Sequence, residues 1–329
     1  MTHHPGDVGQ GTRRATIRTE TTLSTYLDEL LVGAHRRVAT ARDREPLDAL
    51  RERAVAAPVG TPFGSSLTGP GVAVIAEVKR ASPSKGAIAP DLDATVQARA
   101  YIDGGAAAVS VLTEPEHFKG SLADLADVAA LRVPALRKDF VVDRYQIWEA
   151  RAAGAAAVLL IVAALDEPAL ALLHDEALAA GLEVLVEVHD ASEVAAAERI
   201  GATIVGVNAR DLRTFELDPD AFVRLRAQLS DGVLAVAESG IRGADDVARA
   251  AGQGADAVLV GETLVRAEDP AAAVRELVQA GRSADEQPND GVGHEPSATA
   301  NAPTTPASRS SAPPTDPHHV NEPSTTEAL

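Results

Sequence analysis

Eight short runs of apolar residues alternate along this chain with Ala-rich segments of helical periodicity, and this alternation restricts the fold more than any other feature. The runs are nearly continuous in apolar residues, which is typical of strands buried on both faces of a parallel sheet. They recur roughly every 20 to 35 residues, the spacing of a repeating βα unit. The eight runs are 72–78, 107–112, 133–136, 156–161, 183–188, 203–207, 233–237 and 257–260.

Two architectures contain such repeats, the closed (β/α)8 barrel and the open doubly wound sheet. An open sheet predicts a Gly-rich phosphate loop after the first strand. The first run here leads instead into EVKRASPSKG (77–86), which contains neither GxGxxG nor GxxxxGK[ST]. Gly-Ala pairs precede several runs, at 105–106, 154–155, 201–202 and 254–255, where the Gly can end a helix in the left-handed conformation. The pattern therefore predicts an α/β fold with a single TIM barrel.

The two ends of the chain depart from this pattern. Residues 1–20 are polar and lack periodicity, so we expect a disordered N-terminal segment. From Thr22 to about Ala41 apolar residues recur with helical spacing, which predicts an extra helix before the barrel. The acidic tail, 282–329, is rich in Pro, Ser and Thr and has no aromatic residue, no Ile and no Lys. Such a tail buries too little apolar surface to offset chain entropy, so we expect it to be disordered and the barrel domain to span 21–281.

Composition excludes several classes of function. The formal net charge of −18 argues against a nucleic-acid partner. The chain has no Cys, which removes disulfides, thiolate nucleophiles and Cys-ligated metals. No apolar run is long enough to span a membrane, and the N-terminus lacks the apolar segment of a signal peptide, so we expect a cytoplasmic protein. The His residues have no partners at ligand spacing, so we expect no metal.

Lysine is unusually rare here. Of the 30 Lys and Arg residues only four are Lys, and all four lie between positions 79 and 138. For any single Lys, chance and coding bias explain its presence as well as a functional role does. An amine, however, can be tuned to release a proton near neutral pH, whereas a guanidinium cannot. The clustering therefore indicates that Lys79 and Lys138, at the ends of two runs, take part in chemistry.

Polar groups stand at the carboxyl ends of most predicted strands, where a TIM barrel carries its active site. An isolated acid at such a place is more often a salt-bridged rim residue than a catalytic one. Polar groups at several strand ends weaken that interpretation and favour acid–base chemistry on a polar substrate. The strand-end candidates are Glu77, Lys79, Lys138, Glu187, Asn208, Arg210 and Glu238.

Two turns of small residues predict a phosphate site. Ser239 and Gly240 follow the seventh run, and Gly261 follows the eighth. Barrels often bind phosphate there through backbone N–H groups and the start of a short helix. The acidic side chain of Glu262 must then point away from the phosphate.

Several segments together resemble indole-3-glycerol phosphate synthase. They occur in that family's order and cover about residues 21–281. The segments are IAEVKRASPSKG (75–86), SVLTE (110–114), LRKDF (136–140), EVH (187–189), GVNARDL (206–212), AESGI (237–241) and LVG (259–261).

The resemblance implies conversion of 1-(2-carboxyphenylamino)-1-deoxyribulose 5-phosphate into indole-3-glycerol phosphate, carbon dioxide and water in tryptophan biosynthesis. It implies no cofactor and no metal, only a phosphorylated small-molecule substrate. We expect a monomer with at most weak association with other enzymes of that pathway.

The resemblance also implies residue roles. Lys138 resembles the general acid of ring closure, Glu187 the acid–base group of dehydration, and Lys79 a cation that holds the substrate. Two nearby amines are expected to lower each other's proton affinity, which would help Lys138 act near neutral pH. Glu77, Asn208 and Glu238 resemble positioning groups. The implied substrate-binding residues are Ser82, Phe118, Phe140, Arg210, Leu212, Ser239, Gly240 and Gly261.

Two other functions fit parts of the sequence. Phosphoribosylanthranilate isomerase is a barrel with a similar phosphate site, but that family relies on a Cys–Asp pair and this chain has no Cys. A non-catalytic barrel that binds a phosphorylated metabolite or a partner protein would not need Lys and Glu residues in its mouth.

Overall fold

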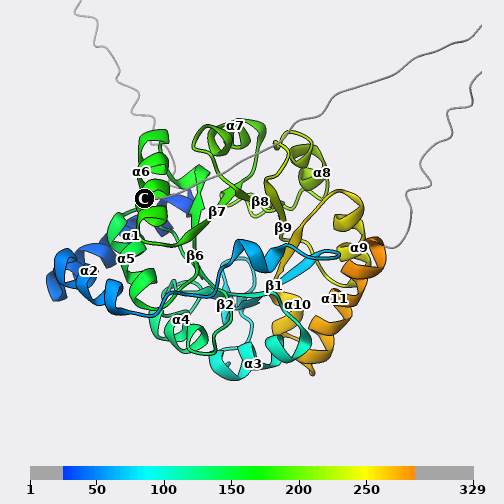
Figure 1. The fold of residues 1–329 in the computed structure, drawn as a ribbon, viewed down its shortest axis with the longest axis horizontal. Coiled ribbons are helices and arrows are strands. Elements are labelled where there is room, and N and C mark those ends of the chain that lie inside the picture. Colours follow the sequence, from blue (N-terminus) through cyan, green and yellow to red (C-terminus); the bar gives the residue numbers. More distant parts are fainter. Residues whose placement is uncertain (1–24, 286–329) are drawn as a thin grey trace, which may run out of the picture. The chain divides into compact units, whose positions relative to one another are not determined.

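A computed structural model describes residues 25–285, and these form one closed barrel of eight parallel strands surrounded by helices (Figure 1). Neighbours around the ring follow the order β1-β10-β9-β8-β7-β6-β5-β4, and β1 pairs with both β10 and β4. The predicted TIM barrel is therefore confirmed. The barrel strands are β1 (Ala73–Val78), β4 (Ala108–Leu112), β5 (Ala135–Lys138), β6 (Ala157–Ile161), β7 (Glu183–Val188), β8 (Ile204–Asn208), β9 (Leu234–Glu238) and β10 (Ala257–Val260).

The strands lie within two residues of the runs seen in the sequence. The largest shift is in β5, which begins at Ala135 because Pro134 has no N–H to donate to the ladder. This shift makes Lys138 the last residue of its strand. Strands β4 and β6 are buried at every position, as expected for strands covered on both faces.

Helices cover the outside of the barrel, and most begin at an Asp or Ser whose side chain accepts a backbone N–H, as at Asp93, Ser121 and Asp166. The Gly of each Gly-Ala pair has a positive φ, as predicted. The outer helices are α3 (Ala94–Gly104), α4 (Leu122–Ala129), α5 (Arg144–Ala152), α6 (Glu167–Ala179), α7 (Ala191–Arg199), α8 (Ala221–Arg226), α9 (Ala244–Gly252), α10 (Glu262–Val265) and α11 (Pro270–Asp285).

The core has an inner and an outer layer. The inner layer fills the barrel with side chains such as Ile75, Leu136, Leu185 and Leu259. The outer layer lies between strands and helices and is built mainly from Val, Leu and Ala. Because these side chains pack the barrel interior, the polar strand ends face a mouth above a packed floor.

The N-terminal segment adds α1 (Tyr26–Arg44) and α2 (Leu47–Ala56). Helix α2 packs against α5 (Figure 1), whereas α1 buries Leu27, Leu30 and Ala34 with the inner layer of the core. The predicted extra helix is α1. It begins later than Thr22 because Thr25 and Asp28 form a capping box. The sequence analysis missed α2.

A 3-10 turn, η1 (Gly64–Leu67), closes the bottom of the barrel. The carboxylate of Glu183, at the start of β7, accepts the backbone N–H groups of Phe63 and Gly64. The ring of Phe63 is fully buried in the inner layer.

The remaining elements are β2 (Ala81–Ser82) and β3 (Gly86–Ala87), which form a small antiparallel hairpin after β1, and η2 (Val162–Ala164). Helix α11 ends at Asp285, beyond residue 281 where the sequence predicts the end of the domain. The predicted disorder of 1–20 and of 286–329 lies outside the described residues. Between residues 25 and 285, no helix combines the length and apolarity needed to cross a membrane.

Candidate active site

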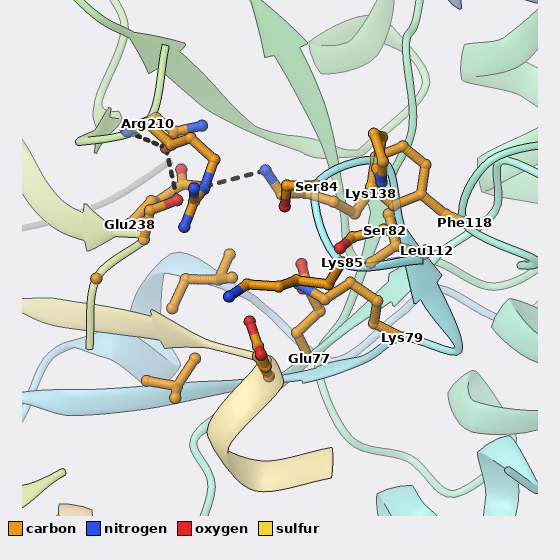
Figure 2. Close-up of a pocket in the computed structure, with 18 of the residues that line it drawn as sticks. Glu77, Lys79, Ser82, Ser84, Lys85, Leu112, Phe118, Lys138, Arg210 and Glu238 are labelled. Atoms are coloured by element: carbon orange, nitrogen blue, oxygen red, sulfur yellow. Dashed lines mark hydrogen bonds and ion pairs between the residues drawn. The ribbon is translucent and has the colours of Figure 1, made fainter. Parts of the chain in front are cut away.

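A cavity of about 430 Å³ opens at the carboxyl ends of the barrel strands. Figure 2 shows Glu77 and Lys79, from the end of β1, together with Lys138 of β5 and Glu238 of β9 around this cavity. Every residue that the sequence analysis placed in the site lines it. These residues are Glu77, Lys79, Ser82, Phe118, Lys138, Phe140, Glu187, Asn208, Arg210, Leu212, Glu238, Ser239, Gly240 and Gly261.

Lys138 lies between two buried carboxylates. Its Nζ is 2.6 Å from Oε2 of Glu187 and 3.0 Å from Oε2 of Glu238. Lys138 ends β5, Glu238 ends β9, and Glu187 is the penultimate residue of β7. One ammonium therefore joins three separate strands at the floor of the cavity.

The charges of this cluster shift its pKa values in different directions. Burial acts to lower the pKa of Lys138, but the carboxylates of Glu187, Glu238 and Glu77 outweigh burial and raise it. The expectation that a second amine lowers the proton affinity of Lys138 is therefore wrong for this structure. The carboxylates lie closer and outnumber the amines, so Lys138 holds its proton firmly before substrate binds.

The two glutamates divide into an anion and an acid. Burial acts to raise the pKa of Glu187, but Lys138 and His189 outweigh it and lower the pKa to about 2. Burial raises the pKa of Glu238 to about 8, with repulsion from Glu187 adding to the shift and Lys138 opposing it. At neutral pH the cluster thus contains an ammonium, a carboxylate and a carboxylic acid.

Asn208 connects this cluster to the neighbouring turn. Its Nδ2 donates to Oε1 of Glu187 over 3.0 Å, and its Oδ1 accepts from the Ser239 hydroxyl over 2.8 Å. The backbone N–H of Arg210 also donates to Oδ1. These bonds fix the amide orientation, so Asn208 presents a donor rather than an acceptor to the carboxylate of Glu187.

A second ion pair lies on β1. Nζ of Lys79 is 2.6 Å from Oε1 of Glu77, which is buried. Position 261 faces this pair, since a Cβ there would lie 2.4 Å from that Oε1 and 3.0 Å from Nζ of Lys79. Only Gly at 261 therefore leaves room for the pair.

The turn after β9 has the geometry of an anion cradle. Ser239 and Gly240 both have positive φ, 66° and 82°, so successive N–H groups turn toward one side. The Thr263 hydroxyl donates to the carbonyl of Ile241 and ties this turn to α10. Glu262 lines the cavity, and its Oε1 is paired with Nε of Arg266 at 3.1 Å.

Aromatic and aliphatic side chains form the opposite wall. The rings of Phe118 and Phe140 are 6.3 Å apart, and Leu212 lies with them in the inner core. The buried carboxylate of Glu114 accepts the backbone N–H groups of His117 and Phe118, which fixes the loop that carries Phe118. A flat apolar group can therefore bind beside the charged floor.

Some residues of the site were not predicted from the sequence. Phe215, Leu217, Arg242 and Arg266 also line the cavity. Arg242 could have been found, because it directly follows the predicted phosphate turn. Of the other two lysines of the chain, Lys85 lines the cavity, whereas Lys119 is not part of its lining.

Comparisons with known proteins agree with this geometry. A family model described as indole-3-glycerol phosphate synthase matches residues 27–277. The chain is 51% identical over 259 residues to the indole-3-glycerol phosphate synthase of Mycobacterium ulcerans (strain Agy99), covering 78% of this chain and 95% of that relative. It is 52% identical over 256 residues to indole-3-glycerol phosphate synthase 1 of Streptomyces coelicolor, with the same coverage.

Solved structures give a likeness of fold alone. The 3-hexulose-6-phosphate synthase from Salmonella typhimurium matches with a TM-score of 0.52 and 17% identity over 64% of this chain and 98% of that one. The family match and the two relatives go further than this fold likeness, because they extend over most of the sequence. By its sequence, this chain belongs to the indole-3-glycerol phosphate synthase family.

Proposed function

We propose that this chain is a carboxy-lyase that converts 1-(2-carboxyphenylamino)-1-deoxyribulose 5-phosphate into indole-3-glycerol phosphate, carbon dioxide and water in tryptophan biosynthesis. The observation that carries the proposal is the placement of Lys138 between Glu187 and Glu238 in a cavity that also contains an anion cradle. Family membership supports the same reaction.

Ring closure requires a proton at the substrate carbonyl. As the ring carbon attacks, negative charge develops on the carbonyl oxygen. Lys138, which holds its proton in the free protein, is the group assigned to stabilise that charge and donate the proton. The neighbouring carboxylates then favour reprotonation of the Lys138 amine.

Dehydration requires an acid for the leaving hydroxyl and a base for a carbon-bound hydrogen. Glu187 is assigned to this step, and Asn208 orients its carboxylate. Glu238, with a pKa of about 8, supplies a neutral carboxyl beside the ammonium. Its proton keeps two adjacent carboxyls from both being charged.

Substrate binding falls to the remaining residues. Lys79, held by Glu77, is assigned to the anionic groups of the substrate, and the turn at Ser239 and Gly240 to its phosphate. Phe118 and Phe140, which line the cavity, are assigned to the aromatic ring of the substrate. Decarboxylation then follows from the return of aromaticity, so the protein mainly holds the geometry and excludes water.

The direct test is to supply the carboxyphenylamino-deoxyribulose phosphate to the full chain and follow indole fluorescence. We expect turnover with no added metal or cofactor. Binding without turnover would favour the non-catalytic barrel, and turnover of phosphoribosylanthranilate alone would favour the isomerase. The monomeric state, the cytoplasmic location and any association with other enzymes of the pathway stay predictions of the sequence.

A further inference from the structure

His189 lies directly behind the catalytic carboxylate. It follows the end of β7 and stands two residues after Glu187, so both side chains leave the same side of the chain. Its Nε2 is 3.5 Å from Oε1 of Glu187. Its Nδ1 is 3.1 Å from Oε2 of Glu193, in the first turn of α7. The imidazole ring therefore stands between two carboxylates.

This placement favours the doubly protonated ring. A neutral imidazole has only one N–H, so one of its two nitrogens would turn a lone pair toward a carboxylate. Nε2 is buried and has no hydrogen-bond partner among residues 25–285. As an imidazolium, His189 hydrogen-bonds Glu193 through Nδ1 and keeps an ion-pair contact with Glu187 through Nε2.

The charges around His189 also favour its doubly protonated form. Burial acts to lower the pKa of His189, but the hydrogen bond to Glu193 and the charges of Glu187, Glu193 and Glu238 outweigh it and raise the pKa. Asp190 and Asp211 also lie near this ring. The nearby cations are Arg213, which lines the same small cavity, and Lys138, which is paired with the far oxygen of Glu187. The acidic groups outnumber these cations.

A second, smaller cavity reaches His189 from outside the substrate site. It has a volume of about 110 Å³. His189 and Glu193 line this cavity but not the larger one, whereas Glu187 lines only the larger one. Leu212 lines both and separates them. A substrate that fills the larger cavity therefore leaves His189 on its far side.

The proposed reaction consumes a proton. The substrate carboxylate leaves as neutral carbon dioxide, and its bonding electron pair restores the aromatic ring. The carbonyl oxygen takes one proton in ring closure and a second when it leaves as water, while one proton is lost from carbon as the indole double bond forms. The balance is one proton taken up in each turnover, at a time when the substrate covers the mouth.

We propose that His189 supplies this proton to Glu187 from behind, and that the ring is a proton store rather than only a cap for α7. This inference rests on the proposed function. In the step, Nε2–H passes its proton to Oε1 of Glu187, which passes it to the departing oxygen. The neutral ring keeps Nδ1–H on Glu193 and is reprotonated at Nε2 after product leaves.

The test compares His189→Asn and His189→Gln with wild type and with His174→Asn. The Asn variant retains an N–H donor for Glu193 but has no titratable ring. His174 is a buried histidine on α6, outside both cavities, and so provides a matched control. We expect kcat to fall about tenfold in the His189 variants with KM little changed, less than the ~10²-fold loss typical of direct proton transfer. The control should keep wild-type kcat.

Two further measurements separate a proton store from a structural role. In His189→Gly the vacated space adjoins the second cavity, so added imidazole should restore turnover in proportion to its concentration. Wild type and His174→Asn should not respond. In wild type, kcat should fall as pH rises through the raised pKa of His189, because the imidazolium is lost. This fall in kcat should be absent from His189→Asn. A separate fall in kcat as pH rises through about 8, where Glu238 loses its proton, should remain in that variant.

Thermal unfolding identifies variants that lost activity by losing structure. A His189→Asn protein that unfolds near the wild-type temperature but retains kcat within twofold would overturn the proposal. So would a large loss of activity that imidazole does not restore in His189→Gly. If wild type itself produces no indole-3-glycerol phosphate, the proposed function fails instead, so the two failures are distinguishable.

Discussion

Oε1 of Glu238 lies so close to Gly206 that a Cβ at position 206 would stand 2.0 Å from it. The two residues are on adjacent strands, β8 and β9, where Gly206 pairs with Val236 and Asn208 with Glu238. The absent side chain makes room for a buried carboxyl to reach across toward Lys138. The glycine is thus a spatial requirement of the charged cluster rather than of the backbone.

Gly206→Ala should displace Glu238 and disrupt the cluster. Real Cβ atoms do not approach an oxygen to that distance, so the carboxyl must move, and displacements of about 1 Å can cost on the order of 10²-fold in rate. We expect kcat/KM to fall by about that factor, measured by indole fluorescence. Gly252→Ala is the control, because no atom lies within 4 Å of its built Cβ. Equal activity of the two variants would contradict the steric argument.

Lys138→Met should lower kcat by about 10²-fold or more, because it removes the proton donor of ring closure. It should lower kcat far more than it raises KM, since the phosphate cradle is on other strands. Lys138→Arg keeps the charge but releases no proton near neutral pH, so it should fail as a proton donor too. Near-normal turnover in either variant would remove Lys138 from the mechanism.

The pKa of Glu238 predicts how stability depends on pH. Its folded-state value of about 8 exceeds the ordinary 4.5, so its stabilising contribution is complete below about pH 4.5 and is lost as pH rises through about 8. Glu238→Gln lacks this group. Urea unfolding at about pH 5 and about pH 9 should therefore show a smaller loss of unfolding free energy in the variant than in wild type.

Other members of the cluster do not mimic this effect. The lowered pKa of Glu187 gives stability that is lost only as pH falls toward about 2, and the raised pKa of Lys138 gives stability that persists throughout this range. The raised pKa of His189 acts in the same direction as Glu238 but is present in both proteins. An identical pH dependence in wild type and variant would show that Glu238 is ionised at neutral pH.

Much of the fold was predictable because the barrel repeats one simple pattern. A buried parallel strand reads as an apolar run, so β6 and β7 could be located from composition alone. Helix α2 was missed because its buried contact is small, with Leu50 and Ala54 as its buried residues. So short an apolar stripe does not stand out from an Ala-rich background.

The sequence was enough to predict which residues form the site, but not the directions in which their pKa values shift. Strand-end position was enough to select Lys138, Glu187 and Glu238, because the fold brings all carboxyl ends together. The number of carboxylates around each amine depends on side-chain directions, which cannot be read from the order of residues in the chain. The sequence therefore predicted a lowered proton affinity for Lys138, where the structure gives a raised pKa. His189 was missed for the same reason, since its partners are fixed only in space.

Tyr26→Phe should weaken substrate binding more than it slows chemistry. The Tyr26 hydroxyl lies 2.6 Å from Nδ1 of His117, and its ring packs edge-on against Phe215, so α1 joins two loops at the mouth. Loss of one such hydrogen bond is worth about 1 kcal/mol, which predicts a KM about fivefold higher with kcat nearly unchanged. Tyr145→Phe, whose hydroxyl binds backbone carbonyls between α1 and α2, should leave KM at the wild-type value. Unchanged KM in Tyr26→Phe would mean that the loops keep their positions without α1.

Two adjacent arginines of α1 should differ sharply in their effect on stability. Arg37 bridges the buried carboxylates of Glu114 and Asp139 at 3.1 Å each, whereas Arg36 pairs with Glu116 at the surface. Removing Arg37 leaves Glu114 buried without its cation, and breaking a buried pair in this way typically costs about 3 kcal/mol or more. An exposed pair is screened by solvent and contributes little to stability. Arg37→Ala should therefore lower the unfolding free energy by about 3 kcal/mol, whereas Arg36→Ala should leave it near the wild-type value, in urea titrations at neutral pH. Since Glu114 also holds the backbone of Phe118, Arg37→Ala should raise KM as well, and equal stabilities of the two variants would show that solvent reaches Glu114.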